Sequence, residues 1–176
     1  TNPGDKVVIF SPFYENYGAD TILTGAEPIY VPLTPPEFTF DPEVLENAFR
    51  QHPKALILCN PSNPCGKVFT RDELELIAGI DKKYDVYVIT DEVYEHQVFD
   101  GARHLSPAAV PGLRERTLVV SSAGKTFNVT GWKVGWVCGP AALVAAVRTA
   151  KQFLTYVNAG PFQPAVAAGL RLPDAY

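Results

Sequence analysis

The stretch that decides the fold is SSAGKTFNVTGWKVGW, residues 121–136. It begins at the end of Thr117–Ser122, an apolar run of strand length that predicts a β-strand. A turn of small residues that carries Lys125 comes next, and Lys133–Cys138 predicts another strand. Small neighbours let a bulky ligand approach the backbone, so this turn predicts a ligand site around Lys125. The alternative is an ordinary solvated surface lysine.

Outward from this turn, apolar runs of strand length alternate with amphipathic helical segments. Further strands are predicted at Lys6–Ser11, Pro28–Leu33, Lys54–Cys59 and Val86–Thr90, and helices over Tyr14–Thr24, from Asp41-Pro42, after the Thr70-x-x-Glu73 capping box and from about Ala141 to Phe153. This alternation predicts a three-layer α/β fold, with a mainly parallel sheet covered by helices on both faces. Ligands of such sheets bind beyond the carboxyl ends of the strands.

Composition excludes several classes of protein. The chain has 176 residues, 47% of them apolar and 19% charged, which suits one globular core. A net charge of −4 argues against a nucleic-acid partner. The sequence contains no membrane-length apolar run and no secretion signal. Its cysteines, Cys59, Cys65 and Cys138, suggest neither a disulfide framework nor a zinc site, so we expect no metal and a reducing, cytoplasmic setting.

Both ends of the chain suggest that it is a piece of a longer protein. Methionine is absent, and the first residues, Thr1–Asp5, read as a turn rather than the start of a domain. The last residues, Arg171–Tyr176, follow soon after a helical pattern. We therefore expect further segments on either side.

Two polar side chains follow other predicted strands. Asp91 emerges from a strand of buried type, so its carboxylate must be paired or hydrogen-bonded. The alternative is a cap on the following turn. Asn63 lies in NPSNPCG, residues 60–66, where two Asn-Pro steps predict a rigid turn that can aim an amide at a ligand. Its alternative is a plain turn that ends a strand.

Further candidates lie close to these residues in the sequence. Tyr94 follows Asp91, and Tyr14 stands where a helix is predicted to begin; either can also be an ordinary packed aromatic. Ser122 and Lys133 flank Lys125. A hydroxyl together with a cation suits a phosphate dianion.

The order of these motifs resembles one enzyme family. The motifs are an aromatic at Tyr14, NPSNPCG at 60–66, DEVYE at 91–95, SSAGK at 121–125 and GWKVGW at 131–136. Together they resemble class I and II aminotransferases of fold type I, which depend on pyridoxal phosphate (PLP). The nearest resemblance is to the branch of kynurenine aminotransferase, glutamine transaminase K and methionine aminotransferase. The broader superfamily usually has arginine at the position of Lys133. The sequence GWKVGW, with lysine there, is typical of this branch.

The resemblance implies pyridoxal 5'-phosphate as the cofactor and a role for each candidate. Lys125 would bind the cofactor covalently and then move the substrate proton as general base and acid. The other candidates would bind the cofactor without a covalent bond: the ring nitrogen by Asp91, the phenolic oxygen by Asn63 and Tyr94, the ring face by Tyr14, and the phosphate by Ser122 and Lys133.

The implied function is transfer of an amino group from an amino acid to a 2-oxo acid. The implied amino acids are aromatic, sulfur-containing or glutamine-like. Alternatives are a cysteine-S-conjugate β-lyase on the same scaffold, and a non-catalytic α/β domain or inactive fragment. Residues 1–176 would form part of the PLP-binding large domain, without its N-terminal glycine-rich turn and the C-terminal small domain. We therefore expect the isolated chain to be inactive.

The same resemblance implies a homodimer. In this family, the region of Phe153–Val157 reaches the active site of the partner subunit. The alternative for Tyr156, within that region, is an ordinary core anchor.

Overall fold

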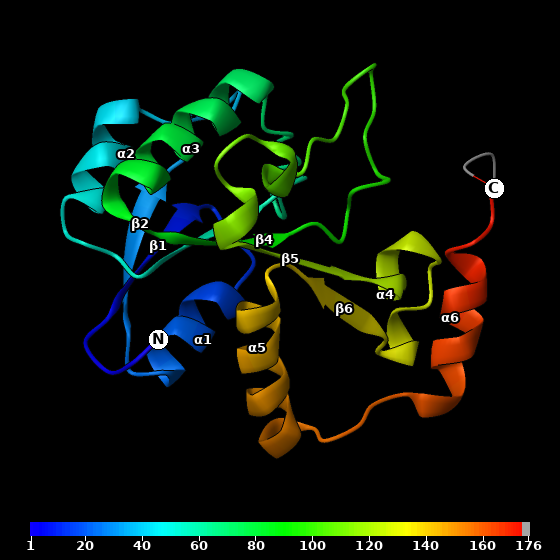
Figure 1. The fold of residues 1–176 in the computed structure, drawn as a ribbon. Coiled ribbons are helices and arrows are strands. Elements are labelled where there is room, and N and C mark those ends of the chain that lie inside the picture. The colour runs from blue at the N-terminus through cyan, green and yellow to red at the C-terminus, as the bar shows by residue number, and fades with distance from the viewer. Residues whose placement is uncertain (174–176) are drawn as a thin grey trace.

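The computed structural model describes residues 1–173 and confirms the α/β fold, with a sheet between helices (Figure 1). The strands in this part of the chain are β1 (Lys6–Ser11), β2 (Glu27–Pro32), β3 (Ala55–Cys59), β4 (Tyr87–Asp91), β5 (Thr117–Ser122) and β6 (Gly135–Cys138). Their order across the sheet is β2-β1-β3-β4-β5-β6. All neighbouring strands are parallel except β6, which runs antiparallel to β5. The sheet is therefore mainly parallel, as predicted.

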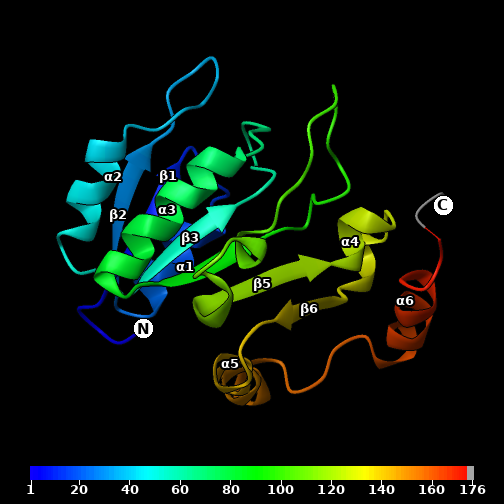
Figure 2. The same cartoon turned by 45° about the horizontal axis from the view of Figure 1, so that its top comes forward.

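Helices lie on both faces of the sheet (Figures 1 and 2). Helices α2 (Pro42–Phe49) and α3 (Arg71–Tyr84) cover one face and contact each other. Helix α1 (Asn16–Leu23) packs on β1 and β2 from the opposite face, and α5 (Ala141–Leu154) lies on the side of α1. Helices α4 (Ala123–Thr126) and α6 (Gln163–Gly169) lie beyond the β5–β6 end of the sheet.

Two helix starts follow directly from the local sequence. The Asp41 side chain accepts a hydrogen bond from the Glu43 amide at 2.8 Å, and Pro42 occupies the first turn of α2. Thr70 and Glu73 form both halves of the predicted capping box at the start of α3. Each cap satisfies backbone NH groups that have no partner within the helix.

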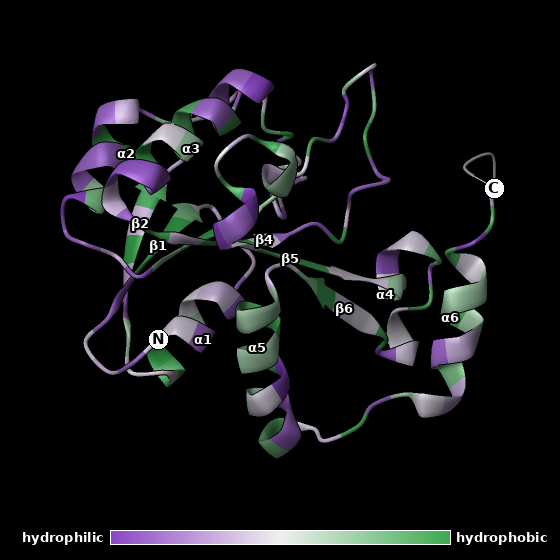
Figure 3. Cartoon of the chain, in the orientation of Figure 1, coloured by the Kyte–Doolittle hydropathy of each residue, from purple (hydrophilic) through white to green (hydrophobic). Residues whose placement is uncertain are grey.

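The main core lies between the sheet and helices α2 and α3, and a smaller one lies under α1. The first cluster includes Phe10, Leu56, Phe69 and Leu74, and Figure 3 shows hydrophobic strands beneath helices whose outer surfaces are polar. A third cluster, around Ala123, Val134 and Val166, packs beside the Lys125 segment. No helix within residues 1–173 combines the length and apolar character needed to cross a bilayer.

The structure differs from the predictions in two connections. The turn that carries Lys125 contains the short helix α4, closed by the Phe127 amide donating to the Ala123 carbonyl at 3.0 Å. The connection before β5, where no helix is predicted, contains two single-turn 3-10 helices, Pro107–Ala109 and Arg114–Arg116. These pieces are too short for hydrophobic periodicity to reveal them.

A buried carboxyl in α3 has no hydrogen-bond partner among residues 1–173. Asp81 is fully buried, and neither of its carboxylate oxygens has a hydrogen-bond partner within the described structure. Burial raises the pKa of Asp81 from 3.8 to about 8, and the charge of nearby Arg116 only partly opposes this shift. Between these values the folded protein binds more protons than the unfolded chain. The free energy of unfolding therefore falls as the pH rises through this window.

We predict that Asp81→Asn removes much of this pH dependence. Urea unfolding of the full-length protein at pH 5 and pH 8 should show the wild type losing on the order of a few kcal/mol. The variant should lose much less, because an amide does not titrate. The exposed Asp20→Asn on α1 is the control and should retain the wild-type slope. Equal slopes for wild type and Asp81→Asn would contradict the assignment.

Candidate active site

The candidate site lies where the parallel strands end. Parallel pairing places the carboxyl ends of β1, β3, β4 and β5 at one edge of the sheet. The pairing sets Cys59, the last residue of β3, directly opposite Asp91, the last residue of β4. Lys125 follows β5 on α4 at this same edge. Residues far apart in the sequence are thereby brought together.

A cavity of about 250 Å³ opens at this edge. Its lining consists of Tyr14, Tyr17, Cys59, Asn63, Asp91, Val93, Tyr94, Lys125 and Thr130. Five of these residues are sequence-predicted candidates: Tyr14, Asn63, Asp91, Tyr94 and Lys125. The structure therefore brings together an amine, a carboxylate, an amide and phenols, which is a set able to hold a polar aromatic ligand.

Asp91 is held at the base of the cavity by two hydrogen bonds. The Tyr17 hydroxyl donates to Oδ2 at 2.7 Å, and the Val93 amide donates to Oδ1 at 3.2 Å. The carboxylate is thus paired, as the sequence required. Its tyrosine partner comes from α1, far away along the chain.

Lys125 occupies a crowded stretch of backbone. A Cβ added at the preceding Gly124 would lie 3.2 Å from the Thr130 Cα and 3.3 Å from the Ser122 Oγ, which is tighter than an ordinary contact. Thr130 also donates its hydroxyl to the Gly124 carbonyl at 3.1 Å. The Lys125 amine lies 5.9 Å from the centre of the Tyr94 ring, within the range of a cation–π contact. Gly124 therefore lets α4 pack closely while its lysine lines the cavity.

Tyr14 and Asn63, two of the candidate ligand contacts, differ in exposure. Tyr14 is 41% exposed within residues 1–173, so it is not a core residue there. Its ring packs edge-on against Tyr17, with 5.8 Å between ring centres. Asn63 is half-buried and lines the cavity. Both side chains can therefore meet a ligand.

Burial changes the titration of several groups around Asp91. Burial, followed by the charges of Cys59 and Asp91, raises the pKa of Tyr17 well above its ordinary range. Burial also raises the pKa of the Cys59 thiol to about 11, against the opposing effect of its contact with Tyr17. Partial burial, with smaller contributions from Cys59, Asp91 and Tyr14, raises the pKa of Tyr94. Near neutral pH the Tyr17 hydroxyl and the Cys59 thiol therefore keep their protons.

The two predicted phosphate contacts lie outside the cavity lining. Ser122 is half-buried at the end of β5, and Lys133 is exposed with a left-handed backbone, φ 54°. The Lys133 carbonyl accepts a hydrogen bond from the Asn158 side chain at 2.6 Å. Phosphate binding by Ser122 and Lys133 stays a prediction.

Buried polar residues anchor the neighbouring loops. Asn60 is fully buried; its amide donates to the Leu105 carbonyl and accepts from the Phe69 amide, both at 3.0 Å. Glu92 accepts from the Ser106 hydroxyl at 2.7 Å and lies 2.9 Å from Nε2 of His104. These bonds secure the loops that follow β3 and β4.

The anchor at Glu92 contains metal-ligating residue types. Possible ligand atoms of Glu92, Glu95 and His104 lie within 4.8 Å of one another. The Glu92 carboxylate, however, is already engaged by His104 and Ser106. Its contacts are those of a hydrogen-bonded loop anchor.

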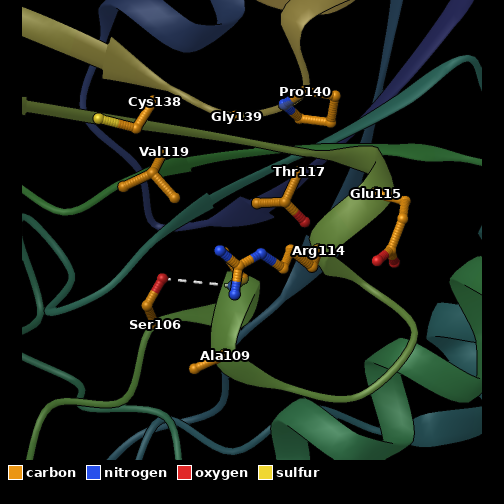
Figure 4. A pocket seen from close by; sticks show the side chains of 10 residues that line it. Ser106, Ala109, Arg114, Glu115, Thr117, Val119, Cys138, Gly139 and Pro140 are labelled. Atoms are coloured by element: carbon orange, nitrogen blue, oxygen red, sulfur yellow. Dashed lines mark hydrogen bonds between the residues drawn. The ribbon is translucent and has the colours of Figure 1, made fainter.

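A larger cavity, of about 580 Å³, lies away from this site (Figure 4). Its lining includes Thr117 at the start of β5 and Cys138 at the end of β6. Arg114 and Ser106 also line it. Because β6 is antiparallel, these positions are at the opposite edge of the sheet from Lys125. The residues that line this larger cavity include no pair of an amine and a carboxylate like Lys125 and Asp91. The candidate site is therefore identified by its chemistry and not by the volume of its cavity.

The sequence did not reveal two residues of the site. Tyr17 lies in a segment whose pattern predicts a helix, and an aromatic residue in such a segment is expected to pack against the core. Cys59 is buried, and it also lines the cavity. The only signal for Cys59 was its position at the end of a predicted strand.

Comparison with known proteins identifies close relatives. The model of the family "Aminotransferase class I and II" matches residues 1–176. The chain is 49% identical over 176 residues to the probable N-succinyldiaminopimelate aminotransferase DapC of Mycobacterium tuberculosis, covering 99% of this chain and 44% of the relative. It is 45% identical over 176 residues to kynurenine–oxoglutarate transaminase 3 of Rattus norvegicus, covering 94% of this chain and 39% of the relative.

Solved structures agree with these matches. The N-succinyldiaminopimelate aminotransferase of Mycobacterium tuberculosis superposes with a TM-score of 0.95 at 49% identity, over 99% of this chain and 46% of that one. YbdL of Escherichia coli, described as a methionine aminotransferase, gives a TM-score of 0.93 at 36% identity, over 97% of this chain and 45% of that one. The chain thus spans less than half the length of the relatives that it matches.

We predict opposite behaviour for the two asparagines of the turn after β3. Asn60→Ala should lower the free energy of unfolding by about 2–3 kcal/mol, because the buried Phe69 amide and the half-buried Leu105 carbonyl lose their partner. Asn63→Ala should change it by less than about 0.5 kcal/mol, because its side chain is half-buried at the cavity. Urea unfolding of the two variants measures both. A loss at Asn63 as large as that at Asn60 would show that Asn63 is a structural residue.

Proposed function

The chain belongs to the class I and II aminotransferase family, and on that premise we propose that the full-length protein transfers an amino group from an amino acid to a 2-oxo acid. The observation that carries the proposal is the placement of Lys125 and Asp91 in one cavity at the carboxyl edge of the sheet. A nucleophilic amine and a hydrogen-bonded, half-buried carboxylate, supported by Tyr94 and Asn63, match the chemistry that amino-group transfer requires.

The residues of the cavity fit pyridoxal phosphate, the cofactor of this family. The Asp91 carboxylate can accept from a protonated ring nitrogen, and the Asn63 amide and Tyr94 hydroxyl can bind the phenolic oxygen. The exposed ring of Tyr14 offers a stacking surface, and the Lys125 amine can reach an aldehyde. Ser122 and Lys133 remain the proposed phosphate contacts.

Pyridoxal phosphate, when bound, supplies an aldehyde that reacts with amines and a ring that withdraws electrons from the substrate. The protein residues provide orientation and proton transfer. Asp91 keeps positive charge at the ring nitrogen, which sustains the electron withdrawal. Lys125 would accept the proton from the substrate α-carbon through Nζ and deliver it to the carbon of the cofactor's former aldehyde group.

We propose amino donors with aromatic, sulfur-containing or glutamine-like side chains. The rat relative is named for kynurenine, and YbdL is described as a methionine aminotransferase. The relative DapC is named for N-succinyldiaminopimelate, a donor with a longer polar side chain. An assay of the full-length protein with kynurenine, methionine and N-succinyldiaminopimelate, each with 2-oxoglutarate, would rank these donors.

We further propose that residues 1–176 are part of a large, cofactor-binding domain and that the full-length protein is a homodimer. The support is the segment that spans the end of α5 and the residues after it, where Phe153 is 85%, Leu154 81%, Tyr156 72% and Val157 63% exposed. Within residues 1–173, Tyr156 is therefore not a core residue. An apolar segment of this kind suits burial against a second subunit.

We predict that pyridoxal phosphate labels Lys125. Borohydride reduction of the full-length protein with the cofactor, followed by peptide mapping, should place the label on the peptide that contains Lys125. Lys125→Arg should abolish that label, whereas Lys82→Ala, which removes an exposed lysine on α3, should leave it unchanged. Label spread over surface lysines, with Lys125 unmodified, would refute the site.

We predict that the 176-residue chain alone is a poor transaminase. No arginine of the described residues lines the cavity, so nothing there clamps a substrate carboxylate in two places. Because misplaced substrate loses the advantage of orientation, activity should be at least about a hundredfold below that of the full-length protein. A coupled assay with several amino donors and saturating cofactor makes this comparison. Comparable activities would show that the chain is self-sufficient.

A further inference from the structure

Tyr17 links α1 to the carboxylate of the candidate site. Its hydroxyl donates to Oδ2 of Asp91 at 2.7 Å, while Oδ1 receives the Val93 amide at 3.2 Å. The ring of Tyr17 packs against the apolar cluster of Val7, Ile9, Ala26 and Ala55 under α1. The hydroxyl is therefore aimed at Asp91 by a side chain that is itself anchored in the core.

Tyr17 is a donor at every pH at which the protein would work. Burial and the neighbouring charges raise its pKa well above the ordinary range, so the hydroxyl keeps its proton. A hydrogen bond donated to a carboxylate favours the charged form. Hydrogen bonds to both oxygens also restrict rotation of the Asp91 carboxylate. Its remaining lone pairs are available to a ligand, because the carboxylate lines the cavity.

We propose that Tyr17 is a positioning residue for the cofactor's ring nitrogen, acting through Asp91. This inference rests on the proposed function, in which Asp91 accepts a hydrogen bond from that nitrogen. A carboxylate that already accepts a bond from Tyr17 competes less strongly for the proton that it shares with the ring. Tyr17 thereby keeps the proton on the ring and holds Asp91 in the orientation that meets it.

The other titratable groups around Asp91 do not substitute for Tyr17. Cys59 faces it from β3, but its thiol donates to the Pro61 carbonyl at 3.3 Å. Tyr94, Tyr14 and Lys125 share the cavity without a hydrogen bond to Asp91 in the described structure. Among the side chains of residues 1–173, Tyr17 is thus the single hydrogen-bond donor to this carboxylate.

The test is Tyr17→Phe in the full-length protein, with pyridoxal phosphate enriched in nitrogen-15 at the ring. The substitution removes one oxygen and keeps the packed ring. Tyr84→Phe is the matched control, because the Tyr84 hydroxyl bonds to Glu46 at 3.2 Å, away from the site. Asp91→Asn gives the signal of a ring nitrogen without its carboxylate.

We expect the Tyr17→Phe nitrogen signal to move from the wild-type position toward that of Asp91→Asn. The kcat should fall about tenfold to a hundredfold, the cost of one hydrogen bond to a charged group, with KM changed by less than about threefold. Tyr84→Phe should match the wild type in all three measurements. A purely structural role for Tyr17 would lower stability and leave the nitrogen signal in place.

The outcomes separate this inference from the proposed function. A wild type with no cofactor on Lys125, or with an unprotonated ring nitrogen, would refute both. A wild type with labelled Lys125 and a protonated ring, together with a Tyr17→Phe variant that has the same nitrogen signal and kcat, would refute the inference alone.

Discussion

Parallel strand pairing is the constraint on which the site depends. Strands that run the same way end at the same edge, so the pairing of β3, β4 and β5 forces the residues after each strand into one region. At one point the strand register pairs two residues of the site directly, because Cys59 lies opposite Asp91. Lys125 reaches the same edge because α4 begins directly after β5. No contact between the site residues themselves is needed to gather them.

The alternation of side chains along the strands separates the residues of the candidate site from the residues that support it. Successive side chains of a strand point to opposite faces of the sheet. At the end of β4, Asp91 meets Tyr17 of α1 on one side, while the next residue, Glu92, binds His104 and Ser106 elsewhere. At the end of β3, Cys59 lines the cavity, whereas Asn60 ties two loops together. The ends of β3 and β4 thus each supply one residue to the site and one to its support.

Two carboxylates of this fold, the half-buried Asp91 and the fully buried Asp81, differ in their hydrogen-bond partners. Asp91 receives two hydrogen bonds, so its charge is compensated where the proposed chemistry needs it. Asp81 receives none from the described part of the chain, and burial raises its pKa to about 8. Compensation thus depends on the immediate partners rather than on burial alone. The hydrogen bond from Tyr17 is therefore as much a part of the site as the carboxylate that it holds.

The sequence by itself determined the alternation of strands and helices, the caps at Asp41 and Thr70, and five residues of the cavity, because these follow from periodicity and from local motifs at strand ends. It could not show the short helix α4, since one turn has no period, nor the exposure of Tyr156. Only the tertiary structure decided that Tyr17 binds Asp91, because that bond joins positions 74 residues apart. Which hydroxyl meets which carboxylate depends on how α1 packs on the sheet, and packing is a property of the whole fold.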